Sequence, residues 1–447
     1  MSIKYSMVSN KSTLISVLLS FISVIFSLSI YGAVLFFSNS LLIIYLSTLF
    51  IILINYGLRL YWTKSSAFNF QLLFIFTYFY YITGEVQSVY KYIGDALSGS
   101  YLEAFVLINA GAIVIVSTLT FFKIKKENNS TRLSNTEINF KGYSKYVTII
   151  VRVFIVFYIM NSFTSSLSLA LYGRHSEVES LVDFGIISAF ITAFAVISPS
   201  ILLLRINKKM SVWKIFDFVL IFLVFVSLAL TGTRFYILFA LVIFSHRIIN
   251  IKKINTLSLS VLFFMAILIG NLVREIRGSF ENFNIENLFY FHSEGLVYYF
   301  SGLVRYYENF SHNYYPLYSV FWSYALIPRS IFSAKPELIG KWILHTNSFQ
   351  EQFSEKHSGS VSFVGPFFAD FGYTMFLPIF FVGLLLAFGE KNYLKYAQEP
   401  SFRGIIYAAF PALIFFSFRS FNTSIIFFVV ISIVILGLSF LQKIRFK

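Results

Sequence analysis

The residues whose types and positions could carry chemistry are a set of cations placed next to long apolar segments of this 447-residue chain. Arginine presents a planar fork of donors that binds phosphate oxygens in pairs. Nearby carboxylates (Glu275, Glu281 and Glu337) offer the alternative of local ion pairs. Taken together, the set predicts a clamp for a pyrophosphate group. Its members are Arg174, Arg234, Arg274, Arg277, Arg305, Arg329, Lys335 and Arg419.

A second group of side chains could move protons. Histidine titrates near neutral pH, and the pKa of a carboxylate can be tuned so that it acts as a base. The candidates in the same connections are His292, Glu294, Glu308, His312, His345, His357 and Asp370. We select Asp370, His345 and Glu294 as candidate catalytic residues. Asp370 differs from the rest because it stands at the end of an apolar segment, where a buried carboxylate needs a partner. The structural alternative to a catalytic role is an ion pair between Asp370 and one of the arginines, which would fix the packing of the helices.

The composition sets the class of protein that must position these side chains. Hydrophobic residues make up 57% of the chain and charged residues only 12%, whereas a soluble domain is about a quarter charged. This excludes a soluble enzyme, a disordered chain and a nucleic-acid-binding domain. The absence of cysteine excludes disulfides and thiolate metal sites. Six scattered histidines lack metal-ligand spacing, so we expect no metal and no cofactor. The predicted fold class is an all-α polytopic membrane protein.

Long apolar segments give the expected spans. A bilayer core of about 30 Å needs about 20 apolar residues in a helix. We expect about twelve spans, of which the third and eighth are short, and we expect the first to be an uncleaved anchor and not a cleavable signal. They cover 14–37, 41–58, 69–84, 101–122, 147–171, 183–204, 215–231, 234–246, 256–273, 364–389, 404–418 and 421–441.

The distribution of charge predicts the orientation. With the N-terminus in the cytoplasm, the inside segments hold 23 basic and 4 acidic residues, and the outside segments hold 11 basic and 15 acidic residues. Arg152 and Asp217 fall within spans, near their cytoplasmic ends, where we expect them to snorkel. This alternation follows the positive-inside rule. It places both termini in the cytoplasm and the candidate clamp on the outer side.

One connection is much longer than the others. Spans occupy 1–273 and 365–447, and between them 274–364 forms a large outward-facing loop that is rich in tyrosine and phenylalanine. We expect amphipathic or re-entrant helices in it, over Leu296–Tyr307 and over 317–326. The aromatic side chains are explained by an interfacial belt, or in part by flat faces on which sugar rings stack.

Two arginine–glycine spacings in outside loops resemble a known family. Arg174 precedes Gly185, and Arg329 precedes Gly340, each with ten residues between. This pair resembles the motifs of the Wzy-type O-antigen polymerases, which are oligosaccharide repeat unit polymerases of bacteria. The segments 327–336, 365–372 and 232–234 also resemble that family.

The resemblance implies a GT-C-like membrane glycosyltransferase in the bacterial cytoplasmic (inner) membrane. It would transfer a glycan from undecaprenyl pyrophosphate to another lipid-linked repeat unit, with inversion and without a metal. The implied partners are the undecaprenyl-pyrophosphate-linked oligosaccharide, membrane lipids and a chain-length regulator protein, with no nucleic acid. An O-antigen ligase, which uses lipid A core as acceptor, is the nearest alternative. A flippase for the same lipid-linked unit is the alternative of another class, although we find neither internal repeats nor midplane charges. A structural or signalling protein would leave the outer arginines unexplained.

Overall fold

The computed structural model is mainly helical, and the residues it describes contain no β-strand. Those residues are 2–63, 69–92, 99–122, 145–172, 185–203, 212–230, 234–248, 295–312, 314–327, 331–337, 339–346, 360–397 and 401–443, together with 261, 265, 268 and 399. Each helix satisfies its own backbone hydrogen bonds, which is what an apolar environment requires of a spanning segment.

The chain divides into two compact units. Unit 1 consists of Met1–Lys125, Lys252–Lys391 and Ile414–Ser424, and unit 2 of Lys126–Ile251, Asn392–Leu413 and Ile425–Lys447. The helices that lie wholly in unit 1 are α1 (Ser2–Phe37), α2 (Leu41–Thr63), α3 (Phe70–Tyr92), α4 (Gly99–Thr120), α11 (Leu296–Tyr307), α12 (Phe321–Tyr324), α13 (Ile339–Thr346), α14 (Gly365–Phe371) and the 3₁₀ helix η6 (Gly372–Met375). Those wholly in unit 2 are α5 (Lys145–Tyr172), α7 (Gly185–Leu203), α8 (Val212–Leu230), α9 (Arg234–Ile248) and α16 (Phe402–Ala408). The residues of α15 (Phe376–Tyr396), α17 (Phe410–Arg419) and α18 (Phe421–Lys443) are divided between the units.

Six helical segments of the described chain are long and apolar enough to cross a membrane: Leu14–Phe37, Leu41–Trp62, Gly99–Thr120, Gly365–Tyr396, Phe402–Arg419 and Phe421–Leu441. Three shorter apolar helices cover Tyr146–Asn161, Ala189–Leu203 and Phe235–His246. The chain is therefore a helical protein suited to a membrane, as its composition predicts. Eleven of the twelve expected spans fall on helices, whereas the ninth, at 256–273, lies almost entirely outside the described residues.

Two expected spans are interrupted. The segment 404–418 is split at Ala409 into α16 and α17, because Pro411 has no N–H to donate and its ring clashes with the carbonyl four residues earlier. The segment 364–389 is split into α14, η6 and α15. Here Gly372 ends α14 with a φ of 56°, a left-handed conformation that glycine adopts readily. The second break sets α14 apart from the longer helix α15.

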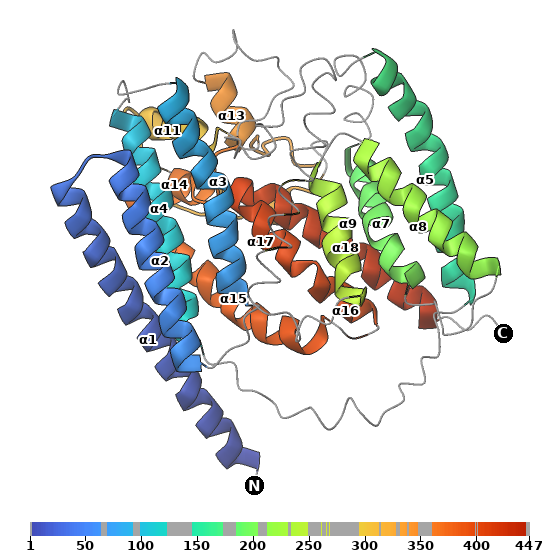
Figure 1. Cartoon of the computed structure of the whole chain (residues 1–447), viewed down its shortest axis with the longest axis horizontal. Helices are drawn as coiled ribbons and strands as arrows, with labels where there is room; N and C mark the ends of the chain where they lie inside the picture. Colours follow the sequence, from blue (N-terminus) through green and yellow to red (C-terminus); the bar gives the residue numbers. More distant parts are fainter. Residues whose placement is uncertain are drawn as a thin grey trace. The chain divides into compact units, whose positions relative to one another are not determined.

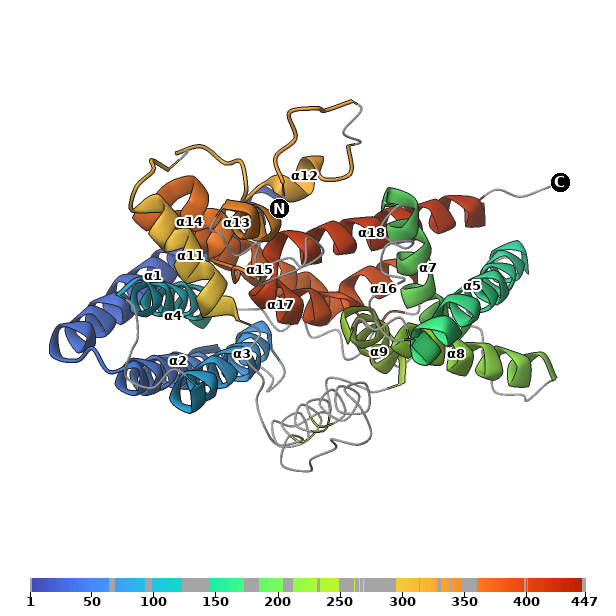
Figure 2. The same ribbon diagram turned by 90° about the horizontal axis from the view of Figure 1, so that it is seen from above.

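Helix α4 forms the centre of unit 1. It contacts α1, α2, α3 and α11, and the ribbon places it among them (Figures 1 and 2). Its small residues allow close packing. A Cβ added at Gly111 would come within 2.6 Å of Cγ1 of Val364, so the segment leading into α14 lies directly against α4.

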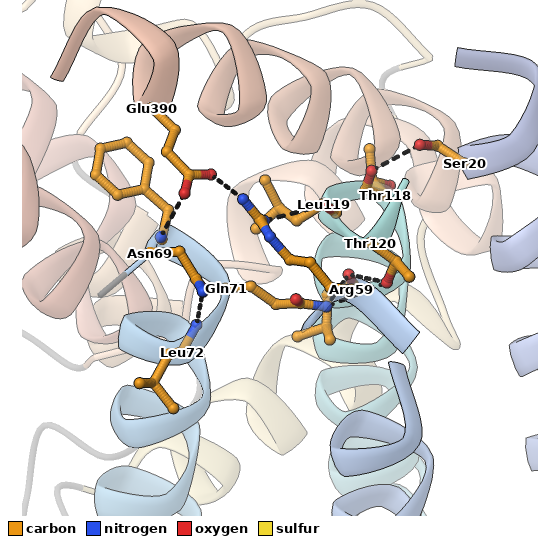
Figure 3. Close-up of polar contacts among 11 residues, drawn as sticks. Ser20, Arg59, Asn69, Gln71, Leu72, Thr118, Leu119, Thr120 and Glu390 are labelled. Atoms are coloured by element: carbon orange, nitrogen blue, oxygen red, sulfur yellow. Dashed lines mark hydrogen bonds and ion pairs between the residues drawn. The ribbon is translucent and has the colours of Figure 1, made fainter. Parts of the chain in front are cut away.

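A buried ion pair fixes one end of these helices (Figure 3). Nη2 of Arg59, in the last turns of α2, lies 2.7 Å from Oε2 of Glu390, and both side chains are at most 1% exposed. Arg59 also donates to the carbonyl of Leu119 at 3.0 Å, and Glu390 accepts from the amide of Phe70 at 3.3 Å. Gln71 adds hydrogen bonds to α4 through the carbonyl of Val116 and the hydroxyl of Thr120. The pair therefore joins the end of α2, the start of α3, the end of α4 and α15.

Unit 2 is built around α7, which contacts α5, α8 and α9. Arg152 and Asp217, which are expected to snorkel, pair with each other: Nε and Nη2 of Arg152 donate to the two carboxylate oxygens of Asp217 at 2.8 and 2.9 Å. This fork geometry satisfies both charges within the helices. His246 contributes a second polar contact, with Nε2 2.7 Å from the hydroxyl of Tyr393.

Candidate functional site

Asp370, in the last turn of α14, is fully buried and accepts four hydrogen bonds. Its carboxylate oxygens lie 3.0, 2.9 and 2.7 Å from the amide nitrogens of Leu317, Tyr318 and Ser319, and 2.6 Å from the hydroxyl of Ser319. Several donors directed at one carboxylate can stabilise a buried negative charge. The partner of Asp370 among the described residues is thus a turn of backbone amides and not the expected arginine.

Carbonyl groups of the same turn also accept hydrogen bonds. Nδ2 of Asn422 donates to the carbonyl of Tyr318 at 2.7 Å, and the hydroxyl of Tyr324 donates to the carbonyl of Leu317 at 2.6 Å. Burial raises the pKa of Tyr324 to about 12, with the negative charge of Asp370 as the second cause. The Tyr324 hydroxyl therefore stays protonated and available as a donor at neutral pH. Peptide groups 317–319 are fixed through both their N–H and C=O groups.

Lys335 closes the segment that follows this turn. Its ammonium group donates to the carbonyl of Ala325 and, at 3.1 Å, to that of Ile327, and it lies 5.8 Å from the centre of the Phe321 ring. These contacts draw together the two ends of 325–335, the stretch of sequence that contains Arg329. The contacts assign to Lys335 a role in shaping the loop.

Arg419 and Arg305 are the two arginines of the expected clamp whose side chains are described. Arg419 ends α17, is exposed, and donates from Nε to the hydroxyl of Ser360 at 3.1 Å. Next to it, the amide of Phe363 donates to the carbonyl of Phe418 at 3.0 Å, which fixes the end of α17 against the segment before α14. Arg305 is exposed in the last turn of α11, where a positive charge complements the helix dipole.

The other expected site residues are placed by backbone alone or lie outside the described residues. Arg234 begins α9 and Gly185 begins α7, both in unit 2. Gly340 is buried in α13, and His345 lies near the end of that helix in unit 1. The remaining ones, which the structure does not describe, are Arg174, Arg274, Arg277, Arg329 and Glu294. Convergence of the arginines on one site therefore stays a prediction.

Glu85 is a buried carboxylate that is not among the candidate residues selected from the sequence. It lies in α3, is 2% exposed, and accepts a hydrogen bond from the amide of Leu296, the first residue of α11, at 2.8 Å. A carboxylate at a helix N-terminus is stabilised by the helix dipole. Its charge and that of Arg419 both act on Tyr299, whose pKa is raised chiefly by burial. A lone acidic residue directly after an apolar segment is the signal that could have identified Glu85.

His312 packs in an aromatic environment beside Asp370. Its ring stacks on Tyr307 with centroids 4.2 Å apart and meets the edge of Phe368 at 4.9 Å. Burial lowers the pKa of His312, and the backbone carbonyls of Ala369 and Phe368 oppose that shift. The imidazole is therefore neutral near pH 7 and able to accept a proton. Its buried Nδ1 has no hydrogen-bond partner in the described part of the chain.

Aromatic side chains surround this region. Tyr306 stacks on Phe310 at 4.4 Å and meets the edge of Trp342 at 4.7 Å, and Tyr318 lies 6.1 Å from Trp342. The expected helix over Leu296–Tyr307 is confirmed as α11, whereas within 317–326 only Phe321–Tyr324 is helical. Residues 317–319 form a turn, because their amides bind Asp370.

The arrangement can hold a negative charge, accept a proton and present aromatic faces. Within the described residues no group of three or more histidine, aspartate and glutamate side chains is placed to hold a metal ion. Comparisons with protein-family models, curated proteins and solved structures find no match to this chain.

Proposed function

We propose that this chain is a membrane glycosyltransferase that polymerises undecaprenyl-pyrophosphate-linked repeat units at the outer face of the bacterial cytoplasmic membrane. The proposal includes about twelve spans, a GT-C-like arrangement and cytoplasmic termini. The observation that carries it is the aromatic-rich stretch formed by the described residues of 295–346, which is anchored on Asp370 near the start of the membrane-length segment Gly365–Tyr396. The paired spacings Arg174 to Gly185 and Arg329 to Gly340 support the same function.

Contacts in unit 1 agree with the two faces that the charge pattern predicts. Arg59 and Glu390, both assigned to the cytoplasmic side, pair with each other. Glu85 and Leu296, both assigned to the outer side, are joined by a hydrogen bond at the opposite end of α3. Since residues on one membrane face should meet one another, these contacts support an outer location for the Asp370 region.

The proposed reaction breaks the bond between the anomeric carbon of the donor glycan and its pyrophosphate. The acceptor hydroxyl attacks that carbon and loses its proton to a base, and the pyrophosphate leaves. Arginines of the clamp would neutralise the charge that develops on the leaving group. The four hydrogen bonds of Asp370 favour a positioning role. We therefore propose that the base is one of His345, Glu294 and His312.

Glycan profiling tests this function directly. A strain that lacks the protein should carry single repeat units on its surface, because transfer and export continue without polymerisation. Loss of all surface repeats would instead indicate a ligase or a flippase. Normal long chains in the deletion strain would refute all three functions.

Substitutions test the clamp. Arg329→Ala and Arg174→Ala should each leave single repeat units and lower polymerisation about 100-fold or more, as loss of one charge-stabilising donor does in other enzymes. Arg403→Ala is the matched control, since Arg403 is exposed and stacks on Tyr396. Protein level is measured by immunoblot. Long chains at normal levels in both variants would remove these arginines from the site.

A further inference from the structure

The backbone at Tyr314 is strained. Its φ is 55°, in the left-handed region where side chains with a Cβ are disfavoured and bulky ones are outliers. Such a conformation persists only where the surroundings over-determine it, and it is found preferentially at functional sites. A hydrophobic or structural role for Tyr314 would not require this backbone.

Asp370 imposes the conformation from two directions. Its own main-chain carbonyl accepts the amide of Tyr314 at 2.6 Å, and its carboxylate accepts the amides of 317–319. Pro316 lies between these two attachments, and its ring fixes the φ of that residue. We refer to residues 314–319 as the tyrosine turn. One buried residue therefore fixes both of its ends.

The tyrosine turn directs two rings outward. Tyr314 is 68% and Tyr315 is 55% exposed, whereas Tyr318 of the same turn is buried. The ring of Tyr314 lies 5.9 Å from His312, which is itself stacked on Tyr307. The exposed pair thus continues the aromatic surface of His312 and Tyr307, and the hydrogen-bonded backbone fixes where both side chains leave the turn before any ligand arrives.

We propose that Tyr314 and Tyr315 form a subsite that stacks a sugar ring of the lipid-linked glycan, with Asp370 as its positioning residue. The inference rests on the proposed function, because it names the part of the chain that binds the carbohydrate of the substrate. Tyrosine suits a sugar because it offers a flat apolar face and a hydroxyl that forms hydrogen bonds. Preorganisation by Asp370 removes the cost of ordering the turn on binding.

A membrane-interface belt would also place tyrosines outside the core. Belt residues need only reach the headgroup level, so a belt gives no reason to hold Tyr314 at a positive φ. The strain instead fits a ligand that demands one ring orientation. A sugar ring is such a ligand, whereas a fluid lipid surface is not.

Kinetics in proteoliposomes test the subsite, with the lipid-linked repeat unit of the producing cell as substrate. The variant Tyr314→Gly removes the ring and relieves the strain, because glycine accepts positive φ, so we expect the variant to fold. Combined with Tyr315→Ala, it should raise KM about tenfold, the equivalent of roughly 1.4 kcal/mol, and change kcat less than twofold. Tyr314→Phe should retain most of the affinity.

Tyr61→Ala is the matched control, because Tyr61 is 84% exposed in α2 and lies outside the turn. Its KM should equal that of the wild type. Asp370→Asn places an amide donor against the turn amides and should raise KM as the double variant does. The pH profile of kcat should not change in this variant, since Asp370 positions the turn and does not accept the proton. Loss of one limb of that profile would overturn the positioning role.

A binding measurement separates the subsite from the proposed function. Saturation-transfer NMR uses the repeat-unit oligosaccharide released from lipid and pyrophosphate by mild acid. Transfer should be seen with the wild type and lost with Tyr314→Gly/Tyr315→Ala, even if the protein proves not to polymerise. Polymerisation with unchanged KM and unchanged transfer in the double variant would overturn the subsite and leave the proposed function standing.

Discussion

Two buried carboxylates of unit 1 satisfy their charges by different means. Asp370 uses three backbone amides and a hydroxyl, whereas Glu390 uses the guanidinium of Arg59 and one backbone amide. A buried ion pair contributes little net stability, because desolvation offsets the attraction between the charges. Removing only one residue of the pair is strongly destabilising, since the other buried charge then remains without a partner.

Glu390→Ala should therefore lower the free energy of unfolding by about 3–5 kcal/mol. The double variant Arg59→Met/Glu390→Leu should recover most of that loss, because it leaves no buried charge. Thermal unfolding of the detergent-purified proteins measures both effects. Glu308→Ala, at an exposed residue that follows α11, is the control. A single variant as stable as the control would contradict the pairing.

Stability should also depend on the protonation of His312. Its pKa is lowered from the ordinary value of 6.5, chiefly by burial, so the unfolded chain binds this proton more readily than the folded one. The free energy of unfolding should fall as the pH drops through about 6.5, and the fall should end below the folded pKa. Denaturation of wild type and His312→Phe from pH 7.5 to 5 gives the comparison. Identical pH dependence in the two proteins would exclude the effect.

At the residue scale, the sequence predicts that Asp370 is buried and needs a partner, but it cannot identify that partner. The amides of 317–319 belong to residues of no special type, and their direction depends on how a turn more than fifty positions away folds. Arg59 and Glu390 are likewise 331 positions apart. Both were assigned to one membrane face, yet only packing brings them into contact.

At the scale of elements, apolar length predicts where helices form, whereas local backbone chemistry decides where they break. The segment 364–389 is apolar throughout its middle, yet α14 ends at Gly372 with a φ of 56°. The resulting junction lets Asp370 and His312 lie side by side with the 314–319 backbone. The break at Ala409 could have been predicted from the sequence, because Pro411 lies within the expected span over 404–418.

The α14–η6 junction gives a prediction for this scale. Gly372→Ala should lower the free energy of unfolding by about 1–3 kcal/mol, because alanine is strained at this φ and its Cβ would lie 2.8 Å from Cδ2 of His312. Gly57→Ala in α2 is the matched control, since a Cβ there has nothing within 4 Å, and helix propensity should make it neutral or slightly stabilising. Chemical denaturation compares the two. Equal stabilities would show that the junction is not constrained.

At the scale of the whole molecule, the net charge of +15 is informative only once it is divided between faces. The cytoplasmic excess predicts orientation, and the few outer arginines then mark the candidate site. Composition and charge could predict a helical membrane protein with this polarity. They could not predict the packing of 295–346, because aromatic residues suit an interface, a core and a ligand site equally well.

The absence of cysteine makes the orientation directly testable in living cells. Asn347→Cys should react with a membrane-impermeant thiol reagent added to intact cells whose outer envelope has been opened, because 274–364 is expected outside. Glu127→Cys should react only after the cytoplasmic membrane is permeabilised, because 123–145 is expected inside. The native chain controls for background labelling, and labelling after denaturation confirms that each cysteine is present. The reverse pattern would invert the topology, move the Asp370 region to the cytoplasm and remove it from contact with an outward-facing lipid-linked glycan.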